Sequence, residues 1–361
     1  MSNARPGARP GIAGPRSVAD LIDAGLVPER DRAALDAVAE RYATALTPEM
    51  AALIDPADPG DPIGRQFLPT PQELDRRPEE DADPIGDNTH SPLKGLVHRY
   101  RDRVLLKPLH TCPVYCRFCF RRESVGPAGA GRLSEAELDA AFAYVTAHPE
   151  IFEIIVSGGD PLMLSPRRIA ALAEAAAAIP HLRVMRWHSR VPLVDPGRIS
   201  AGLIGAARRF GGAVYVAVHA NHPREFTPAG IAALARLADS GIAMVSQTVL
   251  LKGVNDDAAV LEELMRCFVA NRVSPYYLHQ GDLAPGTAHF RTTIAEGQAL
   301  MRALRGRLSG LAQPTYVVDL PGGHGKVPVG PSWIDGDGRI SDPNGIRHGY
   351  PMAGQGDQDQ S

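Results

Sequence analysis

The chain has 361 residues, with 38 Lys and Arg against 41 Asp and Glu, so its formal charge is −3. The hydrophobic share of 44% is sufficient for a sizeable core, and the length allows two or three domains or one large α/β barrel with additions. The near balance of charge excludes the basic surface that is typical of nucleic-acid-binding and membrane-surface proteins. The nearest approach to a membrane span, Ile169 to Ile179, is interrupted by Glu174, so no transmembrane helix is predicted.

Both ends of the chain are predicted to be disordered. Residues 1–16 are rich in Pro and Gly and lack the apolar stretch of a signal peptide, and residues 353–361 are polar. Four cysteines do not form a disulfide scaffold in a chain of this length, and three of them lie within eight residues. That spacing indicates metal chemistry in a reducing compartment, so the sequence predicts a cytoplasmic protein.

Residues 17–97 are predicted to form an N-terminal region of short helices and loops. Leu35, Val38 and Tyr42 are apolar residues at helical spacing. Residues 55–92 are dense in Asp, Pro and Gly, which predicts a long loop that covers another part of the molecule.

From residue 98 onward, short apolar runs alternate with helical patterns at a period of about 30 residues, which is typical of a parallel sheet with right-handed crossovers. We predict an α/β fold with a partial (β/α)6-type barrel over residues 98–290, followed by a C-terminal segment over 291–352 that includes a further helix and strand at about 292–308 and 314–319. An open doubly wound sheet is the alternative, although no Gly-rich dinucleotide fingerprint follows the first strand. The six expected barrel strands are 103–108, 152–156, 183–188, 213–219, 242–249 and 273–279, and the helices between them are 134–147, 165–178, 196–210, 227–239 and 256–270.

Three cysteines, Cys112, Cys116 and Cys119, follow the first predicted strand with the spacing C-x3-C-x2-C. Thiolates on one loop can bind a single soft metal centre. A structural zinc site normally has four ligands, whereas the remaining cysteine, Cys267, lies at an apolar helical position that is typical of a small core residue. Three thiolates without a fourth predict an iron–sulfur cluster with one iron open to a reacting ligand.

A glycine pair follows the second predicted strand, in the segment Ser157-Gly158-Gly159-Asp160. Barrel enzymes place their chemistry at the C-terminal ends of strands, and glycines there let a ligand approach the backbone closely. An ordinary strand-to-helix turn is the alternative interpretation of this segment.

Polar residues also lie at the ends of the later strands, namely His188, His219, Gln247 and His279. One histidine at such a position is usually structural. Because these residues come from successive strands at equivalent positions, the pattern predicts that they line a shared cavity.

A glycine-rich segment with a lysine, VVDLPGGHGKVP, spans residues 317–328. It is not a P-loop, because Leu320 stands in place of the first glycine and Val327 in place of the Ser or Thr that binds magnesium. A lysine on a glycine loop that faces a cavity can bind an aldehyde cofactor through its amine and release it during turnover, although most lysines are simply solvated.

Together these segments resemble the lysine 2,3-aminomutase family of radical S-adenosylmethionine (SAM) enzymes, which also use pyridoxal 5′-phosphate (PLP). The likeness runs from about residue 43 to about 345 and includes Phe118 before the third cysteine. It implies a [4Fe–4S] cluster whose open iron binds SAM, and cleavage of SAM to a 5′-deoxyadenosyl radical. It further implies an isomerase that moves the amino group of lysine from C2 to C3 to give β-lysine. The segments that carry the likeness are the cysteine motif, SGGDPL, HANHP, LLKGVND, YYLHQGDLAPGTAHFR and DLPGGHGK.

The resemblance also implies the roles of individual residues. Lys326 would hold PLP, and two carboxylates, Asp282 and Asp319, would bind the distal ammonium of the substrate, since two buried acids without a metal motif require a cation. The fork of Arg121 suits the planar α-carboxylate. The implied residues are Cys112, Cys116 and Cys119 for the cluster, Lys326, Arg99 and Tyr100 for PLP, Ser157, Gly158, Gly159, Asp160, His219 and Gln247 for SAM, and Arg121, Asp282 and Asp319 for the substrate.

The sequence departs from the clostridial members of this family in two respects. Asp256 and Asp257 follow the GVN segment where those enzymes carry a zinc-binding cysteine, and no cysteine follows Cys267, so we expect no zinc. His279 stands where those enzymes have a tyrosine near the cofactor. In its truncated, zinc-free form the chain is more similar to the aminomutases that supply β-lysine for modifying elongation factor P.

Other functions stay open at this point. They are a 2,3-aminomutase for another amino acid such as glutamate, whose acidic side chain Asp282 and Asp319 would repel, a radical SAM enzyme without PLP, a cluster used only for sensing, and a binding module without chemistry. The expected partners are an amino-acid substrate and a one-electron reductant of the flavodoxin or ferredoxin type, with no nucleic acid and no membrane. The oligomeric state, a homo-oligomer included, and the handedness of the product are left open.

Overall fold

The structure is a computed structural model that describes residues 14–126 and 131–349. Its centre is a sheet of nine strands that lie side by side in chain order. Strands β2 to β8 are parallel, and the two edge strands, β1 and β9, are antiparallel to their neighbours. The strands are β1 (Leu96–Tyr100), β2 (Arg103–Leu109), β3 (Glu153–Gly158), β4 (Val184–Ser189), β5 (Ala213–His219), β6 (Ala243–Val249), β7 (Ser274–His279), β8 (Thr315–Leu320) and β9 (Gly325–Pro328).

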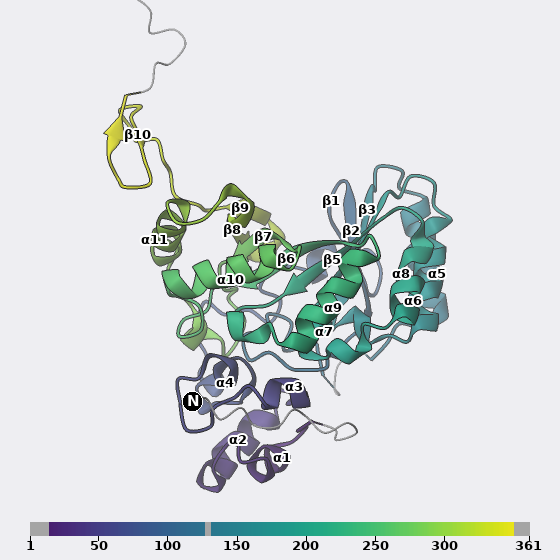
Figure 1. The fold of residues 1–361 in the computed structure, drawn as a ribbon. Coiled ribbons are helices and arrows are strands. Elements are labelled where there is room, and N and C mark those ends of the chain that lie inside the picture. The colour runs from purple at the N-terminus through teal and green to yellow at the C-terminus, as the bar shows by residue number, and fades with distance from the viewer. Residues whose placement is uncertain (1–13, 127–130, 350–361) are drawn as a thin grey trace, which may run out of the picture.

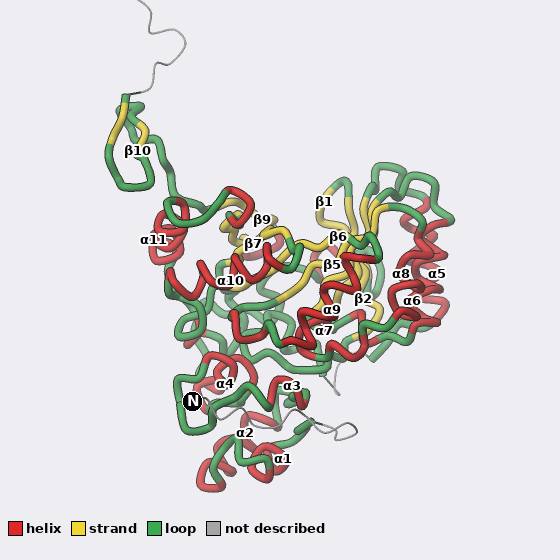
Figure 2. The backbone as a smooth tube through the Cα atoms, in the orientation of Figure 1, coloured by secondary structure: helices red, strands yellow, loops and turns green. Residues whose placement is uncertain are grey.

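Helices connect the parallel strands and lie on the outside of the sheet (Figures 1 and 2). Several begin as the sequence dictates: Ser134 and Glu137 form a capping box at α5, and Thr227 caps α9 ahead of Pro228. The helices are α5 (Glu135–Thr146), α6 (Pro166–Ala177), α7 (Val191–Val194), α8 (Ala201–Ala207), α9 (Pro228–Asp239), α10 (Ala258–Ala270) and α11 (Ile294–Arg305).

The two edges of the sheet approach each other, so that the sheet forms a nearly closed barrel. The backbone N–H of Lys326 in β9 donates to the hydroxyl of Tyr100 in β1 at 2.7 Å. Arg99 in β1 also lies 3.8 Å from Asp319 in β8, measured from Nη1 to Oδ1. These contacts confirm the predicted barrel over the open doubly wound sheet.

All seven predicted parallel strands are present, and β8 joins the sheet beside β7, so the parallel sheet extends past residue 290, the expected end of the barrel. The sequence did not indicate the edge strands. β1 ends in the polar residues His98, Arg99 and Tyr100, and β9 has four residues that include Gly325 and Pro328. Neither contains the apolar run by which a buried strand is recognised.

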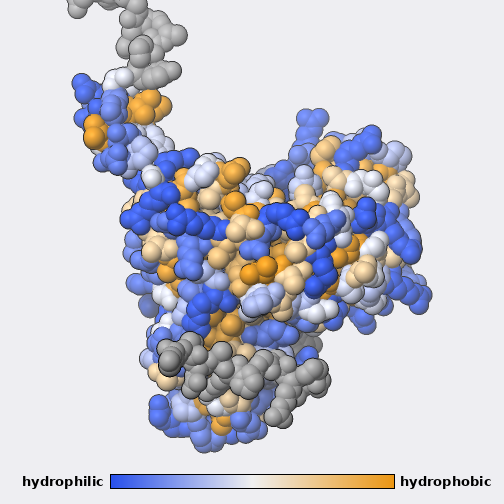
Figure 3. Space-filling model, in the orientation of Figure 1, coloured by the Kyte–Doolittle hydropathy of each residue, from blue (hydrophilic) through white to orange (hydrophobic). Residues whose placement is uncertain are grey.

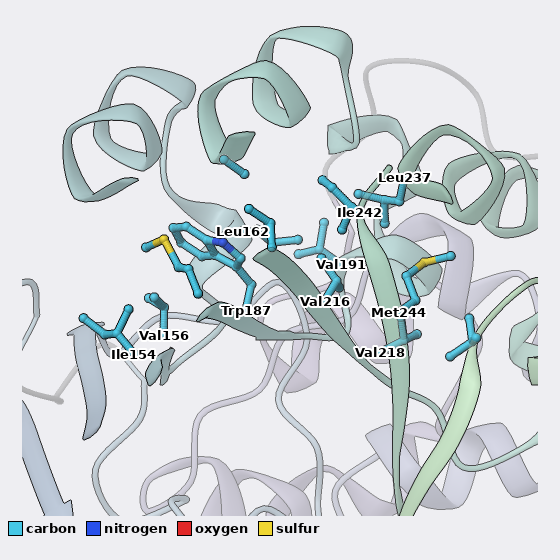
Figure 4. Packing of buried hydrophobic residues seen from close by; sticks show 14 of the residues in the cluster. Ile154, Val156, Leu162, Trp187, Val191, Val216, Val218, Leu237, Ile242 and Met244 are labelled. Atoms are coloured by element: carbon cyan, nitrogen blue, oxygen red, sulfur yellow. The ribbon is translucent and has the colours of Figure 1, made fainter. Parts of the chain in front are cut away.

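The main core lies between the sheet and the helices that cover it. Trp187 of β4 is fully buried, and Leu162, Val191 and Leu237 pack from the covering segments (Figure 4). Such packing of apolar side chains supplies most of the free energy of folding. Because the strands are buried on this face, the polar residues that they carry on the other face point into the barrel.

The N-terminal region forms a second, smaller core that includes Leu21, Met50 and Phe67 and also Val114 from the cysteine segment. Its helices are α1 (Val18–Asp23), α2 (Arg32–Ala39), α3 (Pro48–Ala51) and α4 (Pro62–Phe67). Helix α4 lies inside the range that was expected to be loop. Asp61 explains its start, since its carboxylate accepts hydrogen bonds from the N–H groups of Ile63 and Gly64.

At its C-terminal end the described chain forms a hairpin arm, with strands β10 (Ile340–Ser341) and β11 (Arg347–His348), that projects away from the barrel (Figure 1). Figure 3 shows hydrophilic residues spread over both the arm and the body on this face. No helix in the described ranges is long and apolar enough to cross a membrane. Residues 1–13 and 353–361, most of the two predicted disordered ends, lie outside the described residues.

Candidate active site

One cavity of about 300 Å³ inside the barrel brings all the predicted site residues together. The predicted cavity-lining residues His188, His219, Gln247 and His279 also line it. The lining candidates are Cys112, Cys116, Cys119, Arg99, Tyr100, Arg121, Ser157, Gly158, Gly159, Asp160, His219, Gln247, Asp282, Asp319 and Lys326.

The cysteine segment is anchored to the N-terminal region by buried ion pairs. Arg117 donates from Nε to both carboxylate oxygens of Glu73 at 3.0 Å, and Arg122 also pairs with this carboxylate. Glu73 is fully buried. Since removing one partner of a buried ion pair leaves an uncompensated charge, these contacts hold the segment in place.

Burial raises the pKa of the Cys112 thiol well above its usual value, and the nearby acid Asp160 and the other two thiols add to the rise. Burial also raises the pKa of Cys119, to about 11, with a contribution from Cys116. The contributions of the neighbouring thiols to these two shifts show that the three cysteines lie close together. Cys267 lies apart from them on α10, partly buried.

The glycine pair after β3 is required for the close approach of two backbone segments. A Cβ on Gly158 would lie 2.6 Å from the carbonyl oxygen of Leu109, and one on Gly159 would lie 2.4 Å from that of Thr111. Gly158 also has a φ of +99°. The glycines therefore position the start of the cysteine segment against β3.

The carboxylate of Asp160 is surrounded by hydrogen-bond donors of the protein. It accepts hydrogen bonds from the hydroxyl of Ser189 at 2.7 Å and from the backbone N–H groups of Arg190 at 2.7 Å, Leu162 at 3.1 Å and Val191 at 3.2 Å. Burial raises the pKa of this carboxyl, and the hydrogen bonds act in the opposite direction. Asp160 thereby joins the end of β3 to the end of β4.

Arg121 presents one edge of its guanidinium to Asp87. Its Nε and Nη2 donate to one Asp87 oxygen at 3.1 and 2.9 Å, and its plane lies over the Phe120 ring at 4.3 Å. Nη1 makes no hydrogen bond to the described residues. The other edge of the fork is thus available to a ligand in the cavity.

Asp87 was not predicted as a site residue, and it also contacts Arg99 and Lys107, each at 3.3 Å. Burial would raise its pKa, but the charges of Arg121 and Lys107 lower it to about 2. The Asp- and Pro-rich composition of residues 55–92 was the only sequence signal, and it indicated a loop rather than a charged anchor.

Lys326 lies at the other edge of the barrel, where Asp319 and His279 contact its amine. Its Nζ is paired with Asp319 and lies 3.4 Å from Nδ1 of His279. Burial lowers the pKa of His279, and the charge of Lys326 contributes, so this imidazole is neutral near pH 7. Gly325 has a φ of +95° and packs against Tyr100, so a side chain at this position would be strained.

The two acids near Lys326 have pKa values displaced in opposite directions. Burial raises the pKa of Asp282 to about 7, and the neighbouring Asp319 adds to the rise. Burial would also raise the pKa of Asp319, but His279, whose Nδ1 lies 3.8 Å from Oδ2 of this carboxylate, and the paired amine of Lys326 lower it well below its usual range. Among the described residues, no group donates a hydrogen bond to Asp282.

Comparison with known proteins identifies the family. Residues 106–265 match the radical SAM superfamily, and residues 301–339 match a family described as lysine-2,3-aminomutase. The chain is 41% identical over 290 residues to the L-lysine 2,3-aminomutase of Clostridium subterminale, an alignment that covers 80% of this chain and 69% of that protein. The chain belongs to the lysine 2,3-aminomutase family. It is a radical SAM aminomutase, and therefore an isomerase that uses SAM and a [4Fe–4S] cluster.

Two further relatives extend the comparison. The L-lysine 2,3-aminomutase of Acetoanaerobium sticklandii is 41% identical over 290 residues, covering 80% of this chain and 70% of that protein. The glutamate 2,3-aminomutase of Clostridioides difficile is 33% identical over 306 residues, covering 85% and 72%.

The donors that line the cavity fit the cluster of this aminomutase. In residues 14–126 and 131–349, no three His, Cys, Asp or Glu side chains converge on the position of a single metal ion. A cluster of four irons has a different requirement, because each thiolate binds its own iron. Three thiols placed around one cavity satisfy that requirement.

Two buried nitrogens without partners show that the same cavity is suited to further polar ligands. Nε of Arg99 and Nε2 of His188 make no hydrogen bond among the described residues. Because a buried polar atom without a partner is costly, such atoms mark positions where a bound group completes the hydrogen bonding. Arg99 carries a positive charge, which suits an anionic group such as a phosphate.

Proposed function

We propose that this aminomutase interconverts L-lysine and β-lysine, and that Lys326 binds PLP. The observation that carries the proposal is the pair of carboxylates, Asp282 and Asp319, in the same cavity as the free edge of Arg121. A lysine substrate has a carboxylate at one end and an ammonium at the other, and these groups match the two sites in charge. The higher identity to lysine than to glutamate aminomutases, 41% against 33%, supports the same choice.

Arg121 is assigned the substrate α-carboxylate. Asp87 and Phe120 fix its guanidinium on one edge and one face, so the substrate meets a preoriented fork. A charged hydrogen bond of this kind contributes about 1.5–3 kcal/mol. Asp282 and Asp319 are assigned the distal ammonium, and its arrival favours the ionised form of Asp282.

Lys326 is assigned the attachment of PLP, with Arg99 and Tyr100 contacting the cofactor. When bound, the cluster and SAM supply a carbon-centred radical, and PLP supplies a carbonyl for the amino group and a ring that delocalises an unpaired electron. The amine of Lys326 must lose a proton to react, and the neutral imidazole of His279, whose Nδ1 lies 3.4 Å from Nζ, is placed to accept it, whereas the lowered pKa of Asp319 makes that carboxylate a weak base.

The remaining assignments rest on position in the cavity. Ser157, Gly158, Gly159, Asp160, His219 and Gln247 are proposed to surround SAM, with His219 held by Asn221 at 3.2 Å. We propose that residues 291–352 act as the PLP-binding segment of a zinc-free enzyme and that a flavodoxin or ferredoxin donates the electron. Use of the product to modify elongation factor P is the proposed physiological role.

The test is an anaerobic assay of the reconstituted enzyme with PLP, SAM, dithionite and L-lysine, with detection of β-lysine by chiral chromatography. We expect β-lysine from the wild type and from the Cys267→Ala variant, which removes a cysteine that lies outside the cavity. The Cys116→Ala and Lys326→Ala variants should give none. Formation of β-glutamate from glutamate in place of β-lysine would overturn the choice of substrate, and activity in Lys326→Ala would overturn the role of Lys326.

A further inference from the structure

Arg190 lies beside one ligand of the cluster, directly after β4. Its Nη1 donates to the sulfur of Cys116 at 3.0 Å, and only 5% of its surface is exposed. Its guanidinium also lies over the rings of Phe67 at 4.8 Å and Phe118 at 5.7 Å. A full positive charge is therefore held against a cysteine sulfur, on a side chain that is itself almost completely buried.

Two fully buried side chains prevent Arg190 from moving away. Its Nη2 donates to Glu225 at 2.5 Å and to Oε1 of Gln66 at 3.0 Å, and both partners are 0% exposed. Gln66 in turn donates to Glu225 at 3.2 Å, so the three side chains form a closed network. The backbone N–H of Arg190 is bound to Asp160 at 2.7 Å.

Gln66 connects this network to the cysteine segment. It belongs to α4 of the N-terminal region, and its carbonyl oxygen accepts a hydrogen bond from the backbone N–H of Arg117 at 2.9 Å. Arg117 follows Cys116 directly. One residue of the N-terminal region thus positions both the arginine and the segment that carries the sulfur.

The other two cysteines have different neighbours. Backbone N–H groups approach them, that of Asp160 at Cys112 and that of Arg121 at Cys119. Among the described residues, Cys116 alone accepts a hydrogen bond from a charged side chain. The arrangement is therefore specific to one of the three ligands.

We propose that Arg190, held by Gln66 and Glu225, raises the reduction potential of the cluster through its hydrogen bond to Cys116. Reduction adds one electron to the cluster and its thiolates. A positively charged donor at a ligating sulfur stabilises that added negative charge, and hydrogen bonds to the sulfurs are known to set the potentials of such clusters. The role concerns electron uptake, so it is independent of the amino-acid substrate and of PLP.

The test is a potentiometric titration of the reconstituted cluster, followed by electron paramagnetic resonance, without SAM, PLP or amino acid. Arg190→Met alone would leave Glu225 buried and unpaired, so the variant of choice is the double substitution Arg190→Met with Glu225→Gln. We expect its ratio of reduced to oxidised cluster at a fixed potential to fall about tenfold, a shift of about 59 mV for one electron. Gln66→Met, which leaves both charges in place, should shift the ratio less and in the same direction.

Arg236→Met serves as the control, because Arg236 is an arginine of α9 that lies outside the cavity and binds the carbonyl oxygens of Ile199 and Pro196. Its potential should equal that of the wild type at the same iron and sulfide content. An unchanged potential in both the double variant and Gln66→Met would overturn the proposal, as would an equal shift in Arg236→Met. A double variant that keeps the potential of the wild type and, in a separate binding measurement, only binds SAM more weakly would also overturn it, since Nε of Arg190 has no partner among the described residues.

Discussion

Asp160 and Asp282 are both carboxylates that line the cavity, the first buried and the second half-buried, and their surroundings differ. Four donors from β4, its following turn and the segment after β3 surround Asp160, whereas Asp282 receives no hydrogen bond from the described residues. Burial raises the pKa of both. The comparison separates a carboxylate that maintains the structure from one that is free to bind a cation.

The same contrast applies to the two regions in which these residues lie. Beside the cysteines, Asp160, Gln66 and Glu225 are bound mainly to other protein groups. Beside Lys326, Asp282 and the free edge of Arg121 face the cavity. The first region is suited to holding a permanent cluster, and the second to ligands that change during the reaction.

The largest expected effect is that of Asp160→Ala, which removes the acceptor of four hydrogen bonds. Because buried donors without partners are costly, we expect the free energy of unfolding to fall by about 3 kcal/mol or more, with loss of iron on reconstitution. Urea denaturation and iron analysis measure both. Asp160→Asn, which retains one acceptor oxygen, should lose less. A loss within about 0.5 kcal/mol for Asp160→Ala would contradict the structural role.

Asp282→Asn should leave folding nearly intact and weaken the binding of the substrate. Without the charge that faces the distal ammonium, kcat/KM for lysine should fall about 100-fold, equivalent to about 2.7 kcal/mol. Iron content and the free energy of unfolding, measured as for Asp160→Ala, provide the control. Equal losses of stability in the two variants would remove the distinction between the two aspartates.

The pH dependence tests the same carboxylate without a substitution. The pKa of Asp282 is raised to about 7, so the charged form that binds an ammonium accumulates as the pH rises through that value. We expect kcat/KM for lysine to fall about tenfold per pH unit below 7, and this limb to disappear in Asp282→Asn. An identical limb in the variant would assign it to another group.

Asp87→Asn should have the smallest effect on the reaction, because Arg121 keeps its charge and the amide oxygen of Asn can still accept a hydrogen bond from it. We expect KM for lysine to rise about tenfold with little change in kcat. A large fall in kcat with an unchanged KM would show that Asp87 affects the chemical step rather than the binding of lysine.

Asp87 also has a consequence for stability. Its pKa in the folded protein is lowered to about 2, so its ion pairs stabilise the fold above the pKa of the unfolded chain and are lost as the pH falls from about 4 toward 2. The contribution near neutral pH is about 2 kcal/mol. Urea denaturation of the apoprotein should show that the difference between wild type and Asp87→Asn decreases over this range.

The parallel strands could be predicted because buried strands of this kind are continuous apolar runs. The residues at their ends, such as His188 and His279, could be placed in one cavity because a barrel brings strand ends together. The edge strands β1 and β9 could not, since their pairing depends on closure of the sheet rather than on local composition.

The residues that hold the site together also could not be predicted from the sequence. Arg190 is 124 residues from Gln66 and 35 from Glu225, and Asp87 is 34 from Arg121. Such contacts have no fixed spacing and arise only when distant segments pack. Motifs therefore indicated the groups that face the ligands, and the structure was needed to find the groups that position them.

The most direct test of the central claim, that lysine reacts in this cavity by radical amino migration, uses L-lysine labelled with deuterium at C3. Mass spectrometry would follow the label in 5′-deoxyadenosine and in β-lysine during anaerobic turnover. Removal of hydrogen from C3 and its return at C2 predicts deuterium in both molecules. β-Lysine formed while 5′-deoxyadenosine stays free of deuterium would contradict this account.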